Sequence, residues 1–598
     1  MNSHQLEVDF CVIGGGLSGV CAALSAARNG ARVALVQDRS VLGGNASSEV
    51  KMHVVGADCH GHRPGARETG LIEEFKLEDA YRNPQGTYSM WDLLFYEKVM
   101  ENPNITLLLD SDCVGCTTEE VDGRKVITSA HVVRQPSEEE FHIKARFFAD
   151  CSGDGRLGAE AGADFRMGRE AQADFGEDLA RPEADHQTLG NSILFTAKKH
   201  ATPQPFVRPH WVRTFTKDEF KHRGVGGYEY GFWWAEWGGQ FDTIKDYAKI
   251  RHELLRITLG IWDYVKNSGD HPDSANWVLD WVGAIPGKRE SRRFLGDHVL
   301  TQHDIQSGRI FDDQVAYGGW WLDLHPPSGV DAVDEPPCIQ IHIKDLYSIP
   351  LRSLYSRNIA NLFFAGRNIS ATHVAFASTR VMATCSVMGQ AIGTAAAVLL
   401  TKGGTPLIRE SADADTLHLI QQTLLKDDVF LLDIKNEDPL DLARAAVCSA
   451  SSEGTGTPAS AVTTGINRRI SSDWGTWAVE GENCWQSEGP LGDLTLRWDQ
   501  PQTLSELHLT FCSGLQRELS LSPSAWVMEH SVRAAQPEIV KDYDVYLDGQ
   551  LIQEVRGNYL RKRIHRFEQA VTGRELTVKA LATHGGPTTR VFEVRAYA

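Results

Sequence analysis

The chain has 598 residues, more than one ordinary domain holds, and its 42% hydrophobic and 23% charged residues suit a globular enzyme of about two to four domains. The formal net charge of -19 argues against nucleic acid as a partner, because phosphate binding needs a basic protein face. Long uninterrupted apolar runs are absent, so we expect no membrane span.

The N-terminus and the cysteines indicate the compartment. Residues 1–7 have neither the basic region nor the apolar core of a signal peptide. The 11 cysteines are scattered, as free thiols of a reducing compartment are. We therefore expect a cytoplasmic protein. Cys113 and Cys116 form a C-x-x-C pair that lacks a second pair, so we expect no metal site.

The first 36 residues have the pattern strand, glycine turn, helix, strand. Apolar runs cover 8–13 and 31–36, and between them three glycines have the G-x-G-x-x-G spacing. The first glycine permits a tight turn, the second lets backbone approach a pyrophosphate, and the third lets the helix pack close to the strand. We expect a dinucleotide to bind the residues of this turn: Gly14, Gly16, Leu17, Ser18 and Gly19.

The second strand ends in Gln37-Asp38, where an acidic residue usually holds the adenosine ribose. Gln37 can hydrogen-bond a hydroxyl, and Asp38 can substitute from one position later, so both are candidates. The next segment contains two glycines that let backbone lie against a flat ligand. We expect Gly43, Gly44 and Asn45 to contact the same cofactor.

Residues 51–70 have little periodicity and many Gly, His and Arg residues, which predicts a long functional loop. Its histidines, His53, His60 and His62, are candidates for catalysis or for a covalent cofactor link, and ordinary loop histidines are the alternative.

Helical spacing and alternation then predict helices over 68–81 and 88–102, a strand over 105–110, a hairpin over 113–133 that turns at Asp122-Gly123, and a strand over 141–148. The last strand leads into small residues, Gly and Asp. We expect Ser152, Gly153 and Asp154 to cover the pyrophosphate and ribose of the nucleotide.

Residues 165–350 are rich in Trp and lack the strand–helix alternation of the first region. The aromatic stretches 228–239 and 317–325 either stack on a sugar or ring substrate or fill the core of an antiparallel sheet. The basic turn 288–293 either binds an anionic group or pairs with nearby carboxylates.

A third apolar strand ends at Gly366-Arg367, and we expect both residues to contact the cofactor. A helix rich in small residues is predicted over 379–400, with its positive dipole end toward a ligand. His373 and Arg380 lie at its entrance.

Three separated stretches, 14–19, 149–155 and 363–367, resemble the nucleotide-contacting segments of two-dinucleotide-binding-domain flavoproteins. More specifically, the chain resembles a family of FAD-dependent oxidoreductases over about residues 7 to 400. That resemblance is carried by Leu42 to Glu49, Arg289 to Arg293 and Gly366 to His373. It implies FAD, with the isoalloxazine between the FAD domain and the middle domain, but no particular substrate.

After the FAD region, 401–448 is predicted to be a helical appendage and 449–464 a linker rich in Ser, Gly and Thr. Short alternating strands with turn signals follow. This last region resembles galactose-binding-like or discoidin-like jelly rolls, some of which bind glycans.

The predicted fold is an α/β Rossmann-like FAD domain with an inserted α+β substrate domain, followed by an all-β sandwich (jelly roll). The expected boundaries are 1–164 for the first part of the FAD domain, 165–350 for the substrate domain, 351–402 for the last part of the FAD domain, 403–464 for the appendage and linker, and 465–598 for the sandwich.

The leading functional hypothesis is an FAD-dependent oxidoreductase that acts on a polar small molecule, such as a sugar or glycoside, by hydride transfer to or from flavin N5. His373 is the first candidate for the base, with His53 or His62 second, and Arg380 or Arg67 would stabilise negative charge.

Three alternatives stay open. The same groups can serve an alkene or keto reductase, or the protein can be a glycan-binding protein with a structural flavin. A flavin-dependent enzyme that modifies a macromolecule is the third. The sequence also leaves the oligomeric state open, and a homo-oligomer is one of the alternatives.

Overall fold

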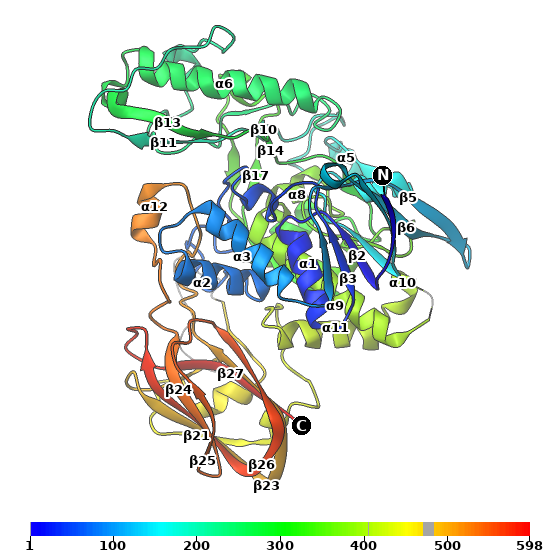
Figure 1. Cartoon of the computed structure of the whole chain (residues 1–598), viewed down its shortest axis with the longest axis vertical. Helices are drawn as coiled ribbons and strands as arrows, with labels where there is room; N and C mark the ends of the chain where they lie inside the picture. Colours follow the sequence, from blue (N-terminus) through cyan, green and yellow to red (C-terminus); the bar gives the residue numbers. More distant parts are fainter. Residues whose placement is uncertain (1, 405, 471–482) are drawn as a thin grey trace.

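The computed structural model describes residues 2–404, 406–470 and 483–598. Figure 1 shows an α/β body in the middle of the molecule, a lobe built on the long helix α6 at one end, and a sheet-rich lobe that carries the C-terminus at the other.

The body is built on a five-stranded parallel sheet. In spatial order its strands are β20 (Leu362–Phe364), β8 (Phe147–Asp150), β2 (Phe10–Ile13), β3 (Val33–Val36) and β4 (Ile105–Leu108). Every residue of the first four is buried, as expected for a parallel sheet covered on both faces. Because β2, β8 and β20 are neighbours and parallel, the three predicted nucleotide-contacting segments meet at one edge of the sheet.

Two helices with small residues pack closely against each other in this body. They are α1 (Leu17–Arg28) and α9 (Met382–Lys402). A Cβ on Gly389 would lie 2.0 Å from the Ser18 carbonyl oxygen, and one on Gly393 would lie 2.2 Å from that of Ala22. The glycines are therefore required by the close approach of the two backbones.

The helix predicted over 379–400 is confirmed as α9, and a second, short helix that was not predicted precedes it. Thr372 caps α8 (His373–Thr379) by accepting from the Ala375 backbone N–H, and Val381 is extended before α9 begins. His373 is thus the first residue of a short helix. Helix α9 has the length and composition of a membrane span, but 94% of its most apolar stretch is buried inside the protein, as in a core helix.

The remaining elements of the body are α2 (Leu71–Arg82), α3 (Tyr88–Met100), α4 (Arg156–Ala161), α10 (Ile408–Ser411), α11 (Ala414–Lys426) and a four-stranded sheet of β1 (Asn2–Glu7), β7 (Glu139–Lys144), β6 (Arg124–Arg134) and β5 (Ser111–Val121). The predicted hairpin is confirmed: Asp122 and Gly123 both have positive φ at its turn. The single strand predicted over 141–148 is wrong. Strand β7 ends at Lys144, and the next strand, β8, joins a different sheet.

The middle region carries short strands and one long helix. Its elements are β9 (Phe165–Arg166), α5 (Gln172–Phe175), β10 (Asn191–Ser192), β11 (Phe195–Lys199), β12 (Glu236–Trp237), α6 (Tyr247–Asn267), β13 (Trp277–Val282), β14 (Gly287–Lys288), β15 (Arg293–Phe294), α7 (Gln302–Gln306), β16 (Gln314–Gly318), β17 (Leu322–Leu324), β18 (Ile339–Ile341) and β19 (Tyr347–Pro350). Phe232 and Trp234 pack with Trp262 of α6 in an aromatic core, so much of the stretch 228–239 has a packing role.

The C-terminal region is a seven-stranded antiparallel sheet, consistent with a β-sandwich. Its strands are β21 (Val447–Ala450), β22 (Trp485–Gln486), β23 (Gly492–Phe511), β24 (Val540–Leu547), β25 (Gln550–Val555), β26 (Lys562–Thr583) and β27 (Arg590–Tyr597), with the short helix α12 (Ala525–His530) in a connection.

The predicted linker 449–464 belongs to this region. Strand β21 pairs with β23, and Ala459 and Val462 are buried in the same apolar core as Trp485. Small residues fit here because they pack in the core, so low apolar bulk was a misleading sign of a linker.

Candidate active site

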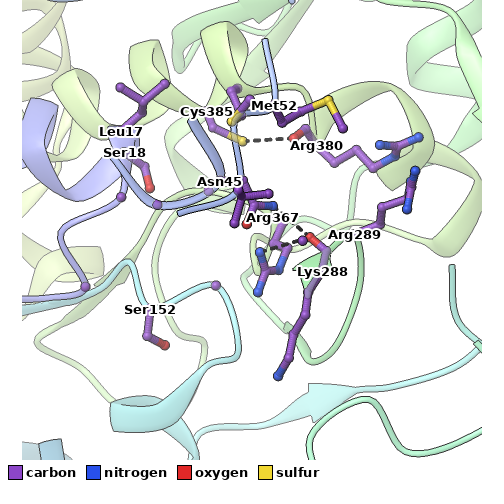
Figure 2. A pocket seen from close by; sticks show the side chains of 18 of the residues that line it. Leu17, Ser18, Asn45, Met52, Ser152, Lys288, Arg289, Arg367, Arg380 and Cys385 are labelled. Atoms are coloured by element: carbon purple, nitrogen blue, oxygen red, sulfur yellow. Dashed lines mark hydrogen bonds between the residues drawn. The ribbon is translucent and has the colours of Figure 1, made fainter. Parts of the chain in front are cut away.

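One cavity of about 540 Å³ opens at the carboxyl ends of β2, β8 and β20. The loops after these strands form one side of it, and residues of the middle region form the other. Figure 2 shows Asn45, Arg367 and Lys288 gathered near its centre, with Leu17 and Ser18 on one side and Arg289 and Arg380 on the other. Ligands of open α/β sheets bind at such an edge.

The side of the cavity formed by the glycine turn after β2, which we call the nucleotide side, is lined by backbone without side chains. A Cβ on Gly14 would lie 2.4 Å from the Cys151 carbonyl oxygen, and one on Gly19 would lie 1.7 Å from that of Gly14, so neither position tolerates a side chain. A Cβ on Gly16 would meet nothing nearer than the Gly44 Cα at 3.9 Å. That open space at a helix N-terminus fits a pyrophosphate.

The two ribose candidates differ in what their side chains already bind. Gln37 Oε1 accepts from the Gly15 backbone N–H at 2.7 Å, and its Nε2 donates to the Val41 carbonyl at 3.1 Å. Both polar ends of Gln37 therefore hold the loops themselves. Asp38 lines the cavity with a side chain 55% exposed and a long ion pair of 3.8 Å to Arg39, which leaves its carboxylate available to a ligand.

Two basic side chains surround Asp154 on the wall of the cavity. Asp154 contacts Lys288 Nζ at 2.5 Å and Arg367 Nη2 at 3.0 Å. Burial alone would raise the pKa of Asp154, but Arg367 and Lys288 outweigh it and lower that pKa to about 2. Two cations face one carboxylate, and the buried Arg367 Nε has no hydrogen-bond partner among the described residues. A bound anion would complete this set.

A second polar cluster lies on the middle-region side. His325 Nδ1 is 2.7 Å from Glu236 Oε2, and its Nε2 is 3.0 Å from Asp323 Oδ2. Arg380 donates to the same Asp323 oxygen at 2.8 Å, and Arg289 lies 3.4 Å from Glu236. We call these five residues the His325 cluster. His325, Asp323, Arg289 and Arg380 line the cavity, next to the Trp233 ring.

The charges of the His325 cluster reinforce one another. Burial would lower the pKa of His325, but Glu236 and Asp323 raise it above its ordinary value. Burial would raise the pKa of Asp323, but His325 and Arg380 hold it well below its usual range. The two carboxylates therefore favour the protonated imidazole, and this ring with two guanidiniums suits a negatively charged oxygen.

Donor atoms of Asp323, His325 and Cys338 lie within 4.8 Å of one another, a set whose chemistry suits a metal ion. However, both ring nitrogens of His325 already face carboxylates, and Arg380 Nη2 lies 3.1 Å from His325 Nε2. The ring nitrogens are therefore already engaged, and the guanidinium occupies the space beside Nε2, so we assign no metal here.

A pair of histidines lies on a third part of the wall. His53 and His60 both line the cavity, with ring centroids 5.8 Å apart, and His60 is 5.3 Å from the Trp320 ring. Burial, with the nearby His60, lowers the pKa of His53 to about 4. His53 is therefore neutral near pH 7 and can accept a hydrogen bond.

All but one of the predicted cofactor residues line the cavity. They are Gly14, Gly16, Leu17, Ser18, Gln37, Asp38, Gly43, Gly44, Asn45, Ser152, Gly153, Asp154, Gly366 and Arg367. Gly19 is the exception, since it packs beneath the turn and supports it.

The predicted catalytic residues divide into two groups. His53 and Arg380 line the cavity, whereas His62, Arg67 and His373 do not. Arg67 is fully buried and pairs with Glu73 at 2.7 Å, so a role at the substrate is wrong for it. Its guanidinium also donates to the carbonyls of Ser513 and Gly514, so it connects the loop 51–70 to the C-terminal region.

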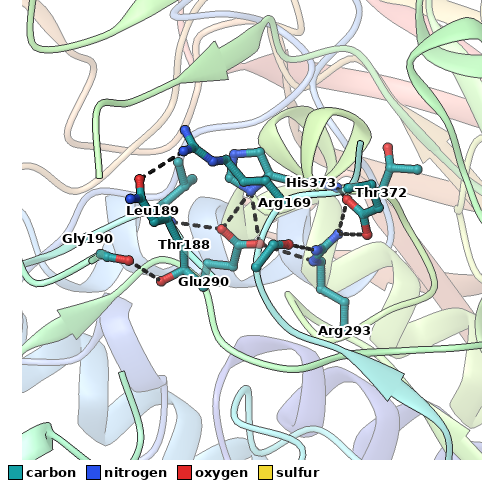
Figure 3. A network of polar contacts seen from close by, with 12 residues as sticks. Arg169, Thr188, Leu189, Gly190, Glu290, Arg293, Thr372 and His373 are labelled. Carbon is teal, nitrogen blue, oxygen red and sulfur yellow. Dashed lines mark hydrogen bonds and ion pairs between the residues drawn. The ribbon is translucent and has the colours of Figure 1, made fainter. Parts of the chain in front are cut away.

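His373, the first candidate for the base, also lies outside this cavity. Its Nδ1 is 3.0 Å from Glu290 Oε2, and the same carboxylate pairs with Arg293 (Figure 3). The ring borders a separate cavity of about 180 Å³ instead. His373 is the first residue of the short helix α8, which ends before Arg380, whereas Arg380 itself lines the main cavity.

The His325 cluster was missed as a unit by the sequence analysis. His325 closes the aromatic stretch that was singled out, and Arg289 belongs to the basic turn, so each had a local signal. Glu236 is 89 residues from His325, and no sequence pattern links the two.

The fold and cavity are those of an α/β dinucleotide-binding protein whose site combines glycine loops at a helix N-terminus with a buried cluster of charged side chains. The family model described as FAD dependent oxidoreductase matches residues 9–410, so this chain belongs to that family and FAD is its cofactor. The donors described above fit this cofactor.

Comparison with curated proteins finds no match. Among solved structures, the C-terminal region is similar to the family 32 carbohydrate-binding module of Clostridium perfringens NanJ in complex with galactose (13% identity, 26% of this chain and 96% of that chain, TM-score 0.19). It is also similar to a Streptococcus pneumoniae fucose-binding module (13% identity, 27% and 97%, TM-score 0.20). At these TM-scores the likeness identifies no ligand for this chain.

Proposed function

We propose that this oxidoreductase acts on a polar small molecule, such as a sugar or glycoside, held between the nucleotide loops and the His325 cluster. The observation that carries the proposal is that one cavity contains both the bare backbone of Gly16 and Gly44 and the buried, doubly paired His325. A site that only bound a cofactor would not need the buried charged side chains of the His325 cluster, because burying charges is costly.

The nucleotide loops would hold FAD through backbone at Gly16 and Gly44, through the Arg367 and Lys288 cations, and through the Asp38 carboxylate. When bound, FAD supplies an acceptor or donor of a hydride equivalent at its isoalloxazine ring. The middle region, residues 165–350, is then the inserted substrate domain, and we keep a cytoplasmic location as part of the proposal.

His325 is the residue that would hold and move the proton. Its Nε2 lies between Asp323 and Arg380 on the cavity wall, so a substrate oxygen that takes the place of the Asp323 contact would receive a proton from the imidazolium or give one to the neutral ring. Arg380 and Arg289 would stabilise negative charge on that oxygen, and the Trp233 ring offers an apolar face to a sugar ring.

The proposal is tested by dye-linked turnover with a panel of sugars, glycosides and hydroxy acids, comparing the wild type with Arg380→Gln. We expect turnover on one class and a loss of about 100-fold or more in Arg380→Gln. Arg352→Gln is the matched control, because Arg352 pairs with Asp313 at the surface, outside the cavity. Full turnover in Arg380→Gln would contradict the proposal, and an inert panel with glycan binding would favour the glycan-binding alternative.

A further inference from the structure

The loop after β23 belongs to the C-terminal region but packs on the loop that lines the cavity. Ser520 Oγ donates to the Val54 carbonyl at 2.7 Å, and the Gly65 backbone N–H donates to the Leu515 carbonyl at 2.8 Å. Between these two contacts, Glu518 Oε1 lies 3.0 Å from His60 Nδ1. A residue 458 positions away in the sequence therefore contacts a cavity-lining histidine.

The backbone around His60 is strained, and the same loop supports it. Cys59, His60 and Gly61 have successive φ angles of 48°, 58° and 78°, all in the left-handed region. This conformation costs about 1–2 kcal/mol for each non-glycine residue, so contacts from outside the loop are needed to keep it. A Cβ on Gly61 would lie 3.4 Å from the Glu518 backbone nitrogen, which shows how closely the two loops approach.

We propose that Glu518 is a positioning residue for His60, and that the C-terminal region thereby completes the active site of the oxidoreductase. The inference rests on the proposed function, since it takes the cavity as the place of reaction. Its structural basis is independent of the His325 cluster, because His60 lies on a different part of the wall.

Glu518 would act on His60 in two ways. A carboxylate at Nδ1 fixes the tautomer with the proton on that nitrogen, and it leaves Nε2, which has no hydrogen bond among the described residues, to face a substrate oxygen. It also favours the protonated ring: burial would lower the pKa of His60, but Glu518 and Asp58 outweigh burial and raise it.

The other charged groups around His60 act in both directions, and Asp58 raises the pKa of His60 as Glu518 does. Lys76 lowers the pKa of His60. His53 is neutral near pH 7, since its own pKa is about 4. Asp58 acts on His60 through space only, whereas Glu518 also makes the direct hydrogen bond to Nδ1, so Glu518 is the carboxylate that positions the ring.

The test is the titration of His60 in the full-length protein, followed by NMR of ring-labelled histidine, with the signal assigned by its loss in His60→Gln. In the wild type we expect a midpoint above the ordinary value of about 6.5. Glu518→Gln should move the midpoint down by about one pH unit or more, and Glu518→Asp should restore part of the shift. Glu554→Gln is the control, because Glu554 is an exposed carboxylate of the same region.

The pH profile of kcat/KM provides a second readout. Whether His60 gives or takes a proton, the limb that belongs to it should move to lower pH in Glu518→Gln by the same amount as the NMR midpoint. An unchanged midpoint in Glu518→Gln would overturn the inference, as would a wild-type midpoint at or below the ordinary value, a result that needs no variant to fold. The NMR titration needs no substrate, so a failure of the proposed function would appear separately, as an absence of turnover.

Discussion

Gly16 and Gly44 face each other across the nucleotide side of the cavity, backbone against backbone. A Cβ on Gly44 would lie 3.1 Å from the Gly16 Cα, and Gly44 has a φ of 60°. The neighbouring Gly43 pairs with Gly16 in a parallel bridge. The two glycine loops thus form one surface, and a side chain on either would occupy the space that a cofactor needs.

Gly44→Ala should weaken FAD binding by about 10-fold or more, because the new methyl group pushes the two loops apart and strains a left-handed residue. The measurement is a fluorescence titration of apoprotein with FAD. Gly123→Ala is the matched control, since Gly123 also has positive φ, but a Cβ there would meet nothing within 4 Å and the residue does not line the cavity. Equal affinity in the wild type and Gly44→Ala would show that the two loops do not bind the cofactor.

His325→Gln should slow substrate-dependent flavin reduction by about 100-fold or more while flavin stays bound, because glutamine has no titratable nitrogen. His373→Gln should instead lower the melting temperature, since it leaves Glu290 buried without its imidazole partner, and it should reduce the rate far less. Stopped-flow absorbance and thermal unfolding separate the two effects. The reverse order of the two rates would restore His373 as the proton-transfer residue.

Arg67→Ala should destabilise the protein by about 3–5 kcal/mol, because it leaves the buried Glu73 carboxylate uncompensated and removes donors to the C-terminal region. Arg32→Ala should cost less than about 1 kcal/mol, because the Arg32–Asp9 ion pair is exposed. Denaturant unfolding measures both variants. Similar small costs would mean that the two regions do not depend on the Arg67 contacts.

Asp92 gives a pH dependence of stability. Burial is the largest cause that raises its pKa from 3.8 to about 6, although the Ser48 backbone N–H donates to it at 3.0 Å. The folded state therefore binds this proton more tightly than the unfolded chain. The resulting stability is fully present below about pH 4 and is lost as the pH rises through about 6.

Asp92→Asn should remove this dependence. Between pH 4 and pH 7 the wild type should lose about 1–3 kcal/mol of unfolding free energy relative to the variant. Urea unfolding at the two pH values measures the difference. Parallel pH profiles for the two proteins would show that Asp92 does not titrate in this range.

The cofactor side of the site could be predicted from the sequence because its chemistry is local. A phosphate-binding turn needs glycines at fixed spacing directly after a strand, and the turn after β2 carries them within six residues. The parallel pairing of β2, β8 and β20 then places the other two predicted segments beside it.

The substrate side could not be predicted in the same way. Glu236 lies on the two-residue strand β12, too short for any periodicity, and reaches His325 only through the tertiary fold. Glu518 lies in a loop of another region and reaches His60 across 458 positions. His373 was misjudged for the converse reason: its position before a helix was a true local signal, but the helix is the short α8, and its first residue borders a different cavity.

The central claim is that this cavity holds FAD and that a polar substrate exchanges electrons with it. The most direct test is the visible spectrum of the purified protein, recorded without oxygen while sugars, glycosides and hydroxy acids are added. We expect one FAD per chain. If the enzyme oxidises its substrate, one class of the panel should remove the flavin absorption near about 450 nm. If it reduces its substrate, the corresponding carbonyl compound should restore that absorption in chemically reduced protein. A protein that takes up no FAD, or a bound flavin that no member of the panel reduces or reoxidises, would contradict the account.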